Sequence, residues 1–367
     1  MMNEEAMRHF LRYGTHAEQR FFVESTHDVY DSVVFNANLI AYSAAGISGF
    51  IARSIQNKPY IIDPQVYTFQ MEPGGLLSEN SSGDMTLKAS VEKLANIYGH
   101  PLDGIAGERR LRVEDLDEGD TLSELCQRVV AFQSSYLTGE ARDQDFWEML
   151  EFAAEASGGT AEDVFRPLGI VSPSFYLPYP DYEPWLEKNV RMIERTRELV
   201  DGIDVWGQIV FDRDLIEDDE FRNKVAKAYR NSDVEKCLLW VDDFNEHEVN
   251  VSMLRQFRRL VQMLNDRGVN LHNLYGGYFS TILTKLSELQ GVCHGPEWGE
   301  TRSVEPVGGG VPVAKFYYPQ LHRRLDFERA LHIARTCGGF RSASAYFENV
   351  CDCEECQSNI DDPEFDF

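Results

Sequence analysis

Runs of apolar, β-branched and aromatic residues recur along most of the chain, and most of them are followed by a helix-like pattern. These runs fit strands that are buried on both faces, because neither face keeps a regular set of polar residues. The segments after them carry apolar residues at three- and four-residue spacing, which predicts amphipathic helices. The eight strand candidates are 32–42, 59–67, 169–177, 205–211, 236–244, 270–278, 291–298 and 312–318. Residues 4–13, ahead of the first strand, are predicted to form a short helix.

Eight buried strands that alternate with helices favour a (β/α)8 barrel, a closed sheet of parallel strands surrounded by helices. An open, doubly wound sheet is the alternative, since it shows the same alternation. Residues 78–165, between the second and third strands, contain three helix-like stretches and are predicted to be a helical insertion. The predicted organisation is a barrel of residues 1–335, including this insertion, and a C-terminal zinc-binding segment of residues 336–367.

The overall composition narrows the class of protein. Hydrophobic residues make up 43% of the 367 residues and aromatic residues 12%, which is typical of a globular protein and not of a disordered one. No apolar run reaches the roughly 18 residues of a membrane helix. The first residues also lack the basic-then-apolar order of a secretion signal. We therefore expect a cytoplasmic protein with no membrane contact.

Acidic residues dominate the charge. The formal net charge is −26, and only nine of the 35 basic residues are lysines. Such a charge repels nucleic acids and anionic membranes at long range. A salt-rich cytoplasm would favour this composition and would also screen the repulsion. A tRNA or DNA partner therefore stays open, as does a homodimer or a different protein partner.

Polar residues gather at the predicted carboxyl ends of the strands, which is where the chemistry of such barrels lies. The residues at these ends are Asp63, Tyr176, Gln208, Asp212, Asp242, Asp243, Tyr275, Gly276, Gly277, His294, Glu297, Lys315 and Tyr317. Because successive strand residues point to opposite faces, one of Asp242 and Asp243 should point into the barrel mouth. That carboxylate is a candidate general base or substrate clamp, although a turn or helix cap explains it equally well. His294 and Glu297 form a candidate acid–base or metal pair, with packing as the alternative role for His294.

Three cysteines close to the C-terminus form a C-x-C-x2-C motif: Cys351, Cys353 and Cys356. Thiolates at this spacing can face one point, and Zn2+ is the usual ion in such sulfur-rich sites. No His or Cys follows Cys356, so a fourth protein ligand must lie upstream, with Cys337 the first candidate and His332 the second. We expect a structural zinc site. Free thiols on an acidic tail are the alternative.

The last quarter of the chain and one early strand resemble the tRNA-guanine transglycosylases. In that family of (β/α)8 barrels, the last strand leads into a C-x-C-x2-C zinc motif. The order here is similar: LYGGYFSTILTKL, GVCHGPEW, KFYYPQLHRRLDFERA and then CDCEEC. The turn at residues 275–278 looks like the family's turn beside the base. The segment YIIDPQVYTFQ resembles the family's early Asp-Ser-Gly-Gly-Phe-Gln segment, with Asp63 in the place of the aspartate.

This resemblance implies a purine-like base and exchange of that base at an N-glycosidic bond in nucleic acid. The candidate catalytic carboxylates for this reaction are Asp63 and Glu297, which lie in the segments that carry the resemblance, and Asp243 at its strand end. The candidate substrate-binding residues are Tyr275, Gly276, Gly277 and His294 in those segments, and Gln208 from its predicted strand. Two departures stand out: where the family has its nucleophilic aspartate, this sequence has His294 and Glu297, and the family's histidine zinc ligand after the third cysteine is missing.

Two other functions fit the same residues. One is a non-catalytic relative of this family that lost the nucleophile and binds a nucleic acid or a protein. The other is an unrelated barrel hydrolase with a metal ion at His294 and the Asp242–Asp243 strand end.

Overall fold

The computed structural model divides the chain into two compact units, Met1–Gly308 and Gly309–Phe367. It describes residues 8–14, 22, 29–55, 58–139, 144–156, 158–295, 300–305 and 315–360. The division after residue 308 lies earlier than the boundary predicted after residue 335. A strand hairpin and a helix that the sequence assigned to the barrel therefore belong to the same unit as the C-terminal cysteines.

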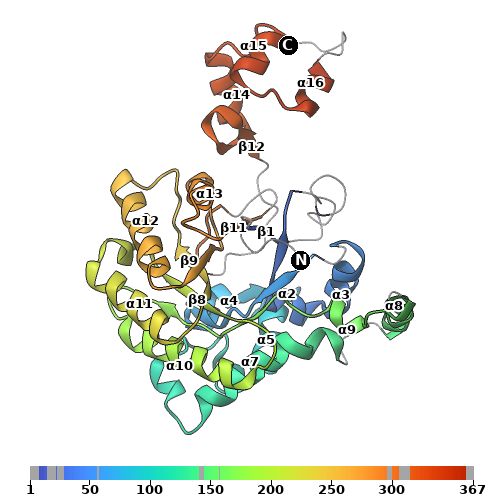
Figure 1. Cartoon of the computed structure of the whole chain (residues 1–367), viewed down its shortest axis with the longest axis vertical. Helices are drawn as coiled ribbons and strands as arrows, with labels where there is room; N and C mark the ends of the chain where they lie inside the picture. Colours follow the sequence, from blue (N-terminus) through green and yellow to red (C-terminus); the bar gives the residue numbers. More distant parts are fainter. Residues whose placement is uncertain are drawn as a thin grey trace. The chain divides into compact units, whose positions relative to one another are not determined.

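The strands of the first unit form one parallel sheet with eight positions, in the order β3, β2, β1, β11, β10, β9, β8 and β6. Their bounds are β1 Arg8–Arg12, β2 Ser32–Asn36, β3 Tyr60–Asp63, β6 Ile170–Val171, β8 Val205–Asp212, β9 Lys236–Asp242, β10 Asn270–Asn273 and β11 Gly291–His294. The short strand β7 (Tyr176–Leu177) pairs with β8 beyond β6. At the two ends of this order, the N–H of Leu168 donates to the carbonyl of Tyr60 at 2.7 Å. The sheet is thus a nearly closed barrel (Figure 1), consistent with the predicted TIM-type fold.

Two predicted elements are wrong. Residues 8–12 form strand β1, not a helix, and β1 lies between β2 and β11. The predicted eighth strand, 312–318, gives no barrel strand, because its described part is β12 (Lys315–Tyr318), which pairs antiparallel with β13 (Arg323–Asp326). Both errors arise because a short apolar run has too few residues for its periodicity to identify its partners. Lys315 and Tyr317 therefore do not belong to the barrel rim.

Alternate residues of each strand face the barrel interior and the surrounding helices. The interior cluster contains large aromatic and branched side chains: Phe10, Val34, Ile61, Val171, Trp206, Val210, Leu238, Trp240 and Cys293. Their neighbours in sequence, such as Leu11, Ile62 and Leu239, belong to the larger cluster that includes the helices. The barrel is therefore filled with side chains, and polar groups can gather only at its ends.

Helices surround the sheet and supply the insertion (Figure 1). Those outside the insertion are α2 Ala37–Tyr42, α3 Ala44–Arg53, α4 Pro73–Leu76, α10 Glu183–Leu199, α11 Asp219–Asn231, α12 Val251–Asn265 and α13 Tyr278–Lys285. The insertion holds α5 Ala89–Tyr98, α6 Leu102–Ile105, α7 Thr121–Ser135, α8 Gln144–Ala156 and α9 Ala161–Val164. It begins with a hairpin of β4 (Leu77–Glu79) and β5 (Met85–Leu87), and the rest is mainly helical as predicted. No helix among the residues described is long and apolar enough to cross a membrane.

Short polar side chains fix where the barrel helices begin. The Asp218 carboxylate accepts from the backbone N–H of Glu220 at 2.7 Å, at the start of α11. The Asn250 side chain accepts from the N–H of Met253 at 2.9 Å, at the start of α12. Each bond satisfies an N–H that has no partner within its helix. The cap therefore fixes the residue at which the helix begins.

The second unit is small. It contains the β12–β13 hairpin, followed by α14 (Phe327–Thr336), α15 (Ala343–Asn349) and α16 (Glu354–Ile360). Its buried cluster has few members: Tyr318, Leu325, Ala330, Ala334, Val350 and Cys351. A core of this size contributes little hydrophobic stabilisation, so small domains of this kind often depend on a metal ion or a disulfide.

Candidate functional site

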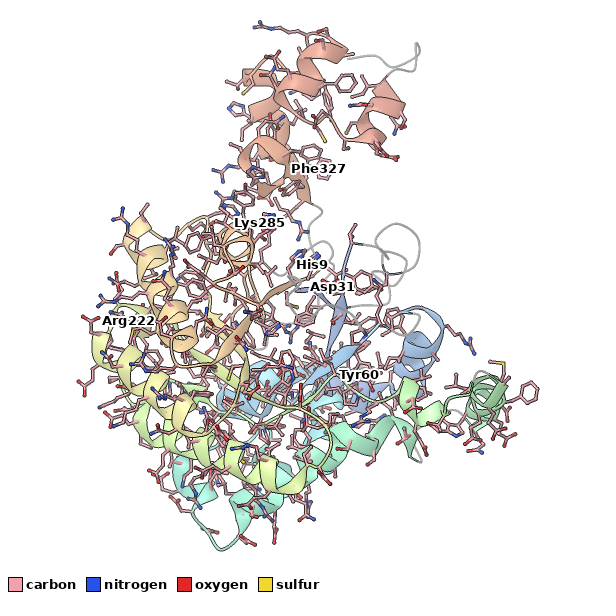
Figure 2. All side chains as sticks on the ribbon, viewed as in Figure 1. His9, Asp31, Tyr60, Arg222, Lys285 and Phe327 are labelled. Carbon is pink, nitrogen blue, oxygen red and sulfur yellow. The ribbon has the colours of Figure 1, made fainter. Side chains whose placement is uncertain are left out.

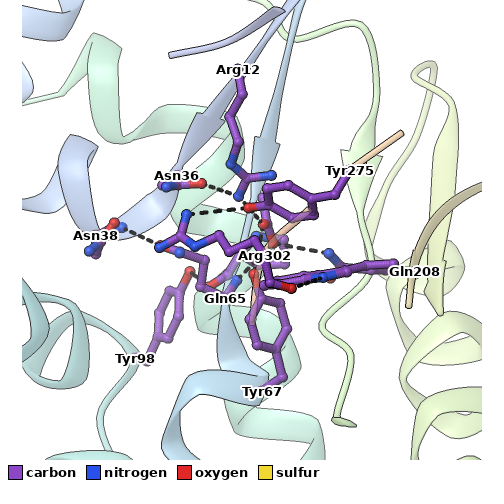
Figure 3. A network of polar contacts seen from close by, with 12 residues as sticks. Arg12, Asn36, Asn38, Gln65, Tyr67, Tyr98, Gln208, Tyr275 and Arg302 are labelled. Carbon is purple, nitrogen blue, oxygen red and sulfur yellow. Dashed lines mark hydrogen bonds and ion pairs between the residues drawn. The ribbon is translucent and has the colours of Figure 1, made fainter. Parts of the chain in front are cut away.

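Asp63, the last residue of β3, is the centre of a buried polar network at the carboxyl end of the barrel. Figure 3 labels other members of this network, among them Arg12, Gln208 and Tyr275. The Asp63 side chain is 0% exposed. Oδ1 accepts from Gln208 Nε2 at 3.0 Å and from the N–H of Gln65 at 3.2 Å. Oδ2 accepts from Arg12 Nη2 at 2.8 Å and from the Tyr67 hydroxyl at 2.7 Å. Four donors therefore occupy this carboxylate, which suits an anchor more than a free nucleophile.

Arg12, the last residue of β1, supplies the positive charge of the network. It is 5% exposed, and Nη2 also donates to Asn36 Oδ1. The guanidinium lies over the Tyr275 ring, 4.6 Å from its centroid. Burial alone lowers the pKa of Arg12, but Tyr275 and the Asp63 carboxylate outweigh it and raise the pKa above its usual value. Within the described residues, Nε and Nη1 have no hydrogen-bond partner, so a buried cation keeps unused donors.

Gln208, on β8, leaves an acceptor beside these donors. Its side chain is 1% exposed, and its Oε1 has no hydrogen-bond partner among the residues described. Aromatic rings lie close by: Trp240 is 4.5 Å from Tyr275 between ring centroids and 5.2 Å from Tyr67. Arg302 donates to the Tyr275 hydroxyl at 3.3 Å. An unpaired buried polar atom is costly, so these atoms indicate a place where a ligand or water supplies the missing partner.

Of the neighbouring carboxylates at the end of β9, Asp242 faces inward and Asp243 does not. Asp242 accepts from the Tyr176 hydroxyl at 3.1 Å and from the N–H of Val304 at 2.7 Å, and burial raises its pKa. Asp243 has a left-handed backbone, with φ of 49°, and its side chain is 66% exposed. It lies 3.6 Å from Arg213. Of the two carboxylates, the structure therefore puts Asp242 at the inner position, while the catalytic candidate Asp243 is exposed.

Gly276 and Gly277 have structural reasons to be glycines. A Cβ on Gly276 would lie 2.5 Å from Val292 Cγ2, and one on Gly277 would lie 2.9 Å from Glu246 Oε2. Glu246 caps helix α13, since its carboxylate accepts from the N–H of Ser280 at 3.2 Å and from the Ser280 hydroxyl at 2.5 Å. The turn thus fits closely around a buried carboxylate, and its resemblance to a base-binding turn stays a prediction.

His294, the last residue of β11, contacts His9 and is not among the residues of the Asp63 network named above. Its Nε2 lies 2.9 Å from Nε2 of His9, and the ring centroids are 4.8 Å apart. Its predicted partner Glu297 lies outside the described residues. Among the residues that are described, His294 does not join Asp242 or Asp243 in a group of three or more potential metal ligands.

The sulfur atoms of Cys351, Cys353 and Cys356 all lie within 4.8 Å of one another, so these residues can hold a metal ion. A tetrahedral zinc with Zn–S bonds of about 2.3 Å needs sulfur atoms about 3.8 Å apart, a spacing inside the 4.8 Å limit of this group. The first candidate for the fourth ligand, Cys337, is exposed, and neither it nor His332 belongs to the group.

Sequence reasoning did not identify Arg12, Asn36, Tyr67 or Arg302 as members of the site. Arg12 was hidden by the helix predicted for residues 4–13. With that segment assigned as a strand, Arg12 stands at a carboxyl end, and a cation there is a recognisable signal. Asn36 is likewise the last residue of its strand. Tyr67 lies in the short 3-10 helix Val66–Gln70 and Arg302 in a loop, and the sequence pattern gives neither side chain an orientation.

Comparisons with protein-family models and with curated proteins find no match for this chain. The resemblance to the tRNA-guanine transglycosylases therefore stays a prediction from the sequence motifs named above.

Proposed function

We propose that the carboxyl end of the barrel binds a purine-like base and that the protein acts on the N-glycosidic bond of that base in tRNA or DNA. The observation that carries this proposal is the buried network with unused donors on Arg12 and an unused acceptor on Gln208. Guanine offers what both groups lack: O6 and N7 accept from an arginine, and its ring N–H and amino groups donate to a carbonyl oxygen.

The arrangement of the predicted residues supports a base site in this position. Asp63 and Tyr275, which lie in segments that resemble the transglycosylases, belong to one connected network with the candidate Gln208. Arg12 joins them through its bond to Asp63 and its contact with the Tyr275 ring. The aromatic side chains nearby suit a flat heterocycle.

The nucleophile decides whether the protein exchanges the base or only binds it. Base exchange through a covalent ribosyl intermediate needs a carboxylate free to attack C1′ of the sugar. Asp63 is occupied by four donors and Asp243 is exposed. Asp242 and Glu297 are the remaining candidates. The occupied Asp63 and the exposed Asp243 also favour a second function, in which the barrel binds the base or its nucleic acid without catalysing exchange.

Guanine binding by the full-length protein tests the base site directly. We expect calorimetry to show binding of guanine and weaker binding of adenine. Gln208→Leu removes the free acceptor and should weaken guanine binding by about tenfold or more, since one hydrogen bond is worth about 1 kcal/mol and an unpaired partner adds to the loss. Gln133→Leu is the matched control, because Gln133 is a buried glutamine whose amide bonds to the backbone of Val171.

A base-exchange assay separates the two functions. Labelled guanine is incubated with tRNA or DNA and with the wild type, Asp242→Ala or Glu297→Ala. Incorporation that is lost in one of these variants supports the enzyme and names its nucleophile. Guanine binding without incorporation supports the non-catalytic function, and absence of both overturns the base site.

We also propose that the metal of the cysteine group is zinc and that its role is structural. Three thiols in a small unit with few buried side chains fit a stabilising site. Water or a residue outside the described range would supply the fourth ligand.

A further inference from the structure

His9 and His294 meet between the first and last strands of the barrel. They are 285 residues apart in sequence, but β1 and β11 pair in parallel, with Leu11 opposite His294. The residues next to them, Phe10 and Cys293, belong to the barrel interior. Because side chains alternate along a strand, both histidines lie on the outer face of the sheet, and both are half-buried.

The second nitrogen of each ring is held by a backbone carbonyl. His9 Nδ1 lies 2.8 Å from the carbonyl oxygen of Val29, and His294 Nδ1 lies 2.7 Å from that of Gly295. A carbonyl oxygen only accepts, so each Nδ1 must carry the hydrogen. In two neutral rings, both Nε2 atoms then present lone pairs to each other at 2.9 Å. That contact is repulsive unless a positive centre lies between the two atoms.

We propose that His9 and His294 bind a divalent first-row transition-metal ion through their Nε2 atoms. With metal–nitrogen bonds of about 2.0–2.1 Å, the observed separation gives an N–metal–N angle of about 90°. This angle suits two neighbouring positions of an octahedral or square-planar ion such as Ni2+ or Cu2+.

The surroundings of the two rings resemble those of known metal ligands. A metal-binding histidine usually donates its other N–H to a carbonyl or carboxylate, which fixes the tautomer and the ring orientation. Both histidines make such a bond. Asp31 adds negative charge next to His9 (Figure 2), since its Oδ2 accepts from the His9 backbone N–H at 2.7 Å. Imidazole nitrogens also distinguish this site from the thiols of the cysteine group.

Nickel content measured after equilibrium dialysis tests the site. The wild type, His9→Asn, His294→Asn and His100→Asn are each dialysed as full chains against Ni2+ alone, and bound nickel per chain is measured by mass spectrometry. Asparagine keeps a donor near the position of Nδ1 but removes Nε2. The exposed His100 is the control for surface histidines. All four proteins keep their cysteines, so only the difference between them reports on the histidine pair.

We expect the wild type and His100→Asn to bind one more Ni2+ per chain than His9→Asn or His294→Asn. Equal nickel in all four proteins overturns the proposal and leaves a pair that shares a proton. If a variant fails to fold, crystals of the wild type soaked in Ni2+ decide the question. An anomalous peak between the two Nε2 atoms supports the site, and its absence at full nickel loading contradicts it.

Discussion

The ion pair of Arg12 and Asp63 is unusual among the ion pairs described, because both side chains are buried. Removing two charges from water costs several kcal/mol, and their attraction often does no more than offset that cost. Stability alone therefore does not explain the pair. The geometry of the pair gives a better explanation. Asp63 accepts from Nη2 of Arg12, while Nε and Nη1 keep no partner among the described residues. At the residue scale, the carboxylate serves as a positioning group for the arginine.

Asp63→Asn tests this description. The change leaves a buried guanidinium without its counter-charge, and we expect the free energy of unfolding in urea to fall by about 3–5 kcal/mol. The exposed pair of Asp243 and Arg213 provides the control, because Asp243→Asn keeps a residue that tolerates a positive φ. It should change stability by less than about 1 kcal/mol. Equal effects of the two substitutions would contradict the central role of Asp63.

At the scale of elements, the start of α13 depends on one buried carboxylate. Glu246 accepts from the N–H of Phe279 at 2.9 Å and from that of Ser280 at 3.2 Å, which are unsatisfied donors of the first helical turn. Bonds of this kind lower a carboxyl pKa, but burial is the larger influence and raises the pKa of Glu246 above its ordinary 4.5. The cap therefore costs stability whenever the carboxylate is charged.

This cost predicts a pH dependence for Glu246→Gln. A folded-state pKa above the unfolded value means that the contribution of Glu246 to stability is fully present below pH 4.5 and declines as pH rises through the folded-state pKa. The stability of the wild type relative to Glu246→Gln should thus be greatest near pH 4 and fall toward pH 7, by about 1.4 kcal/mol for each unit of pKa shift. Urea unfolding at several pH values measures it.

Glu288→Gln gives the opposite control. Hydrogen bonds from Arg258 lower the pKa of Glu288, so its contribution should be lost as pH falls through the folded-state pKa. The stability of the wild type relative to Glu288→Gln should therefore increase as pH rises. If both variants change in the same direction with pH, burial is not the main influence on Glu246.

At the scale of the whole molecule, the repeated alternation of strands and helices made the barrel predictable. The short strand β1 could not be identified from the sequence. Strands such as β8 and β9 are long and apolar, and their alternation with helices is visible in the sequence. Strand β1 is short, so its pattern fitted a helix and concealed Arg12. Asp63 was identifiable from its strand end, but Gln208 lies in the middle of β8 and not at the predicted end. The choice between Asp242 and Asp243 needed the last residue of β9 to be known. The contact of His9 with His294 joins two strands that are paired in the sheet but far apart in sequence, so no local pattern predicts it.

The division into two units predicts that metal removal affects one of them alone. The barrel has an extensive core, while the described part of the second unit has six buried residues in its cluster, one of them a cysteine of the metal group. A chelator should therefore unfold the second unit and leave the barrel transition in calorimetry unchanged. Cys353→Ser should lose the zinc and the smaller transition together. Cys337→Ser, outside the group of three sulfur atoms, should keep both. Zinc that survives in Cys353→Ser but disappears in Cys337→Ser would instead assign the metal to another set of ligands.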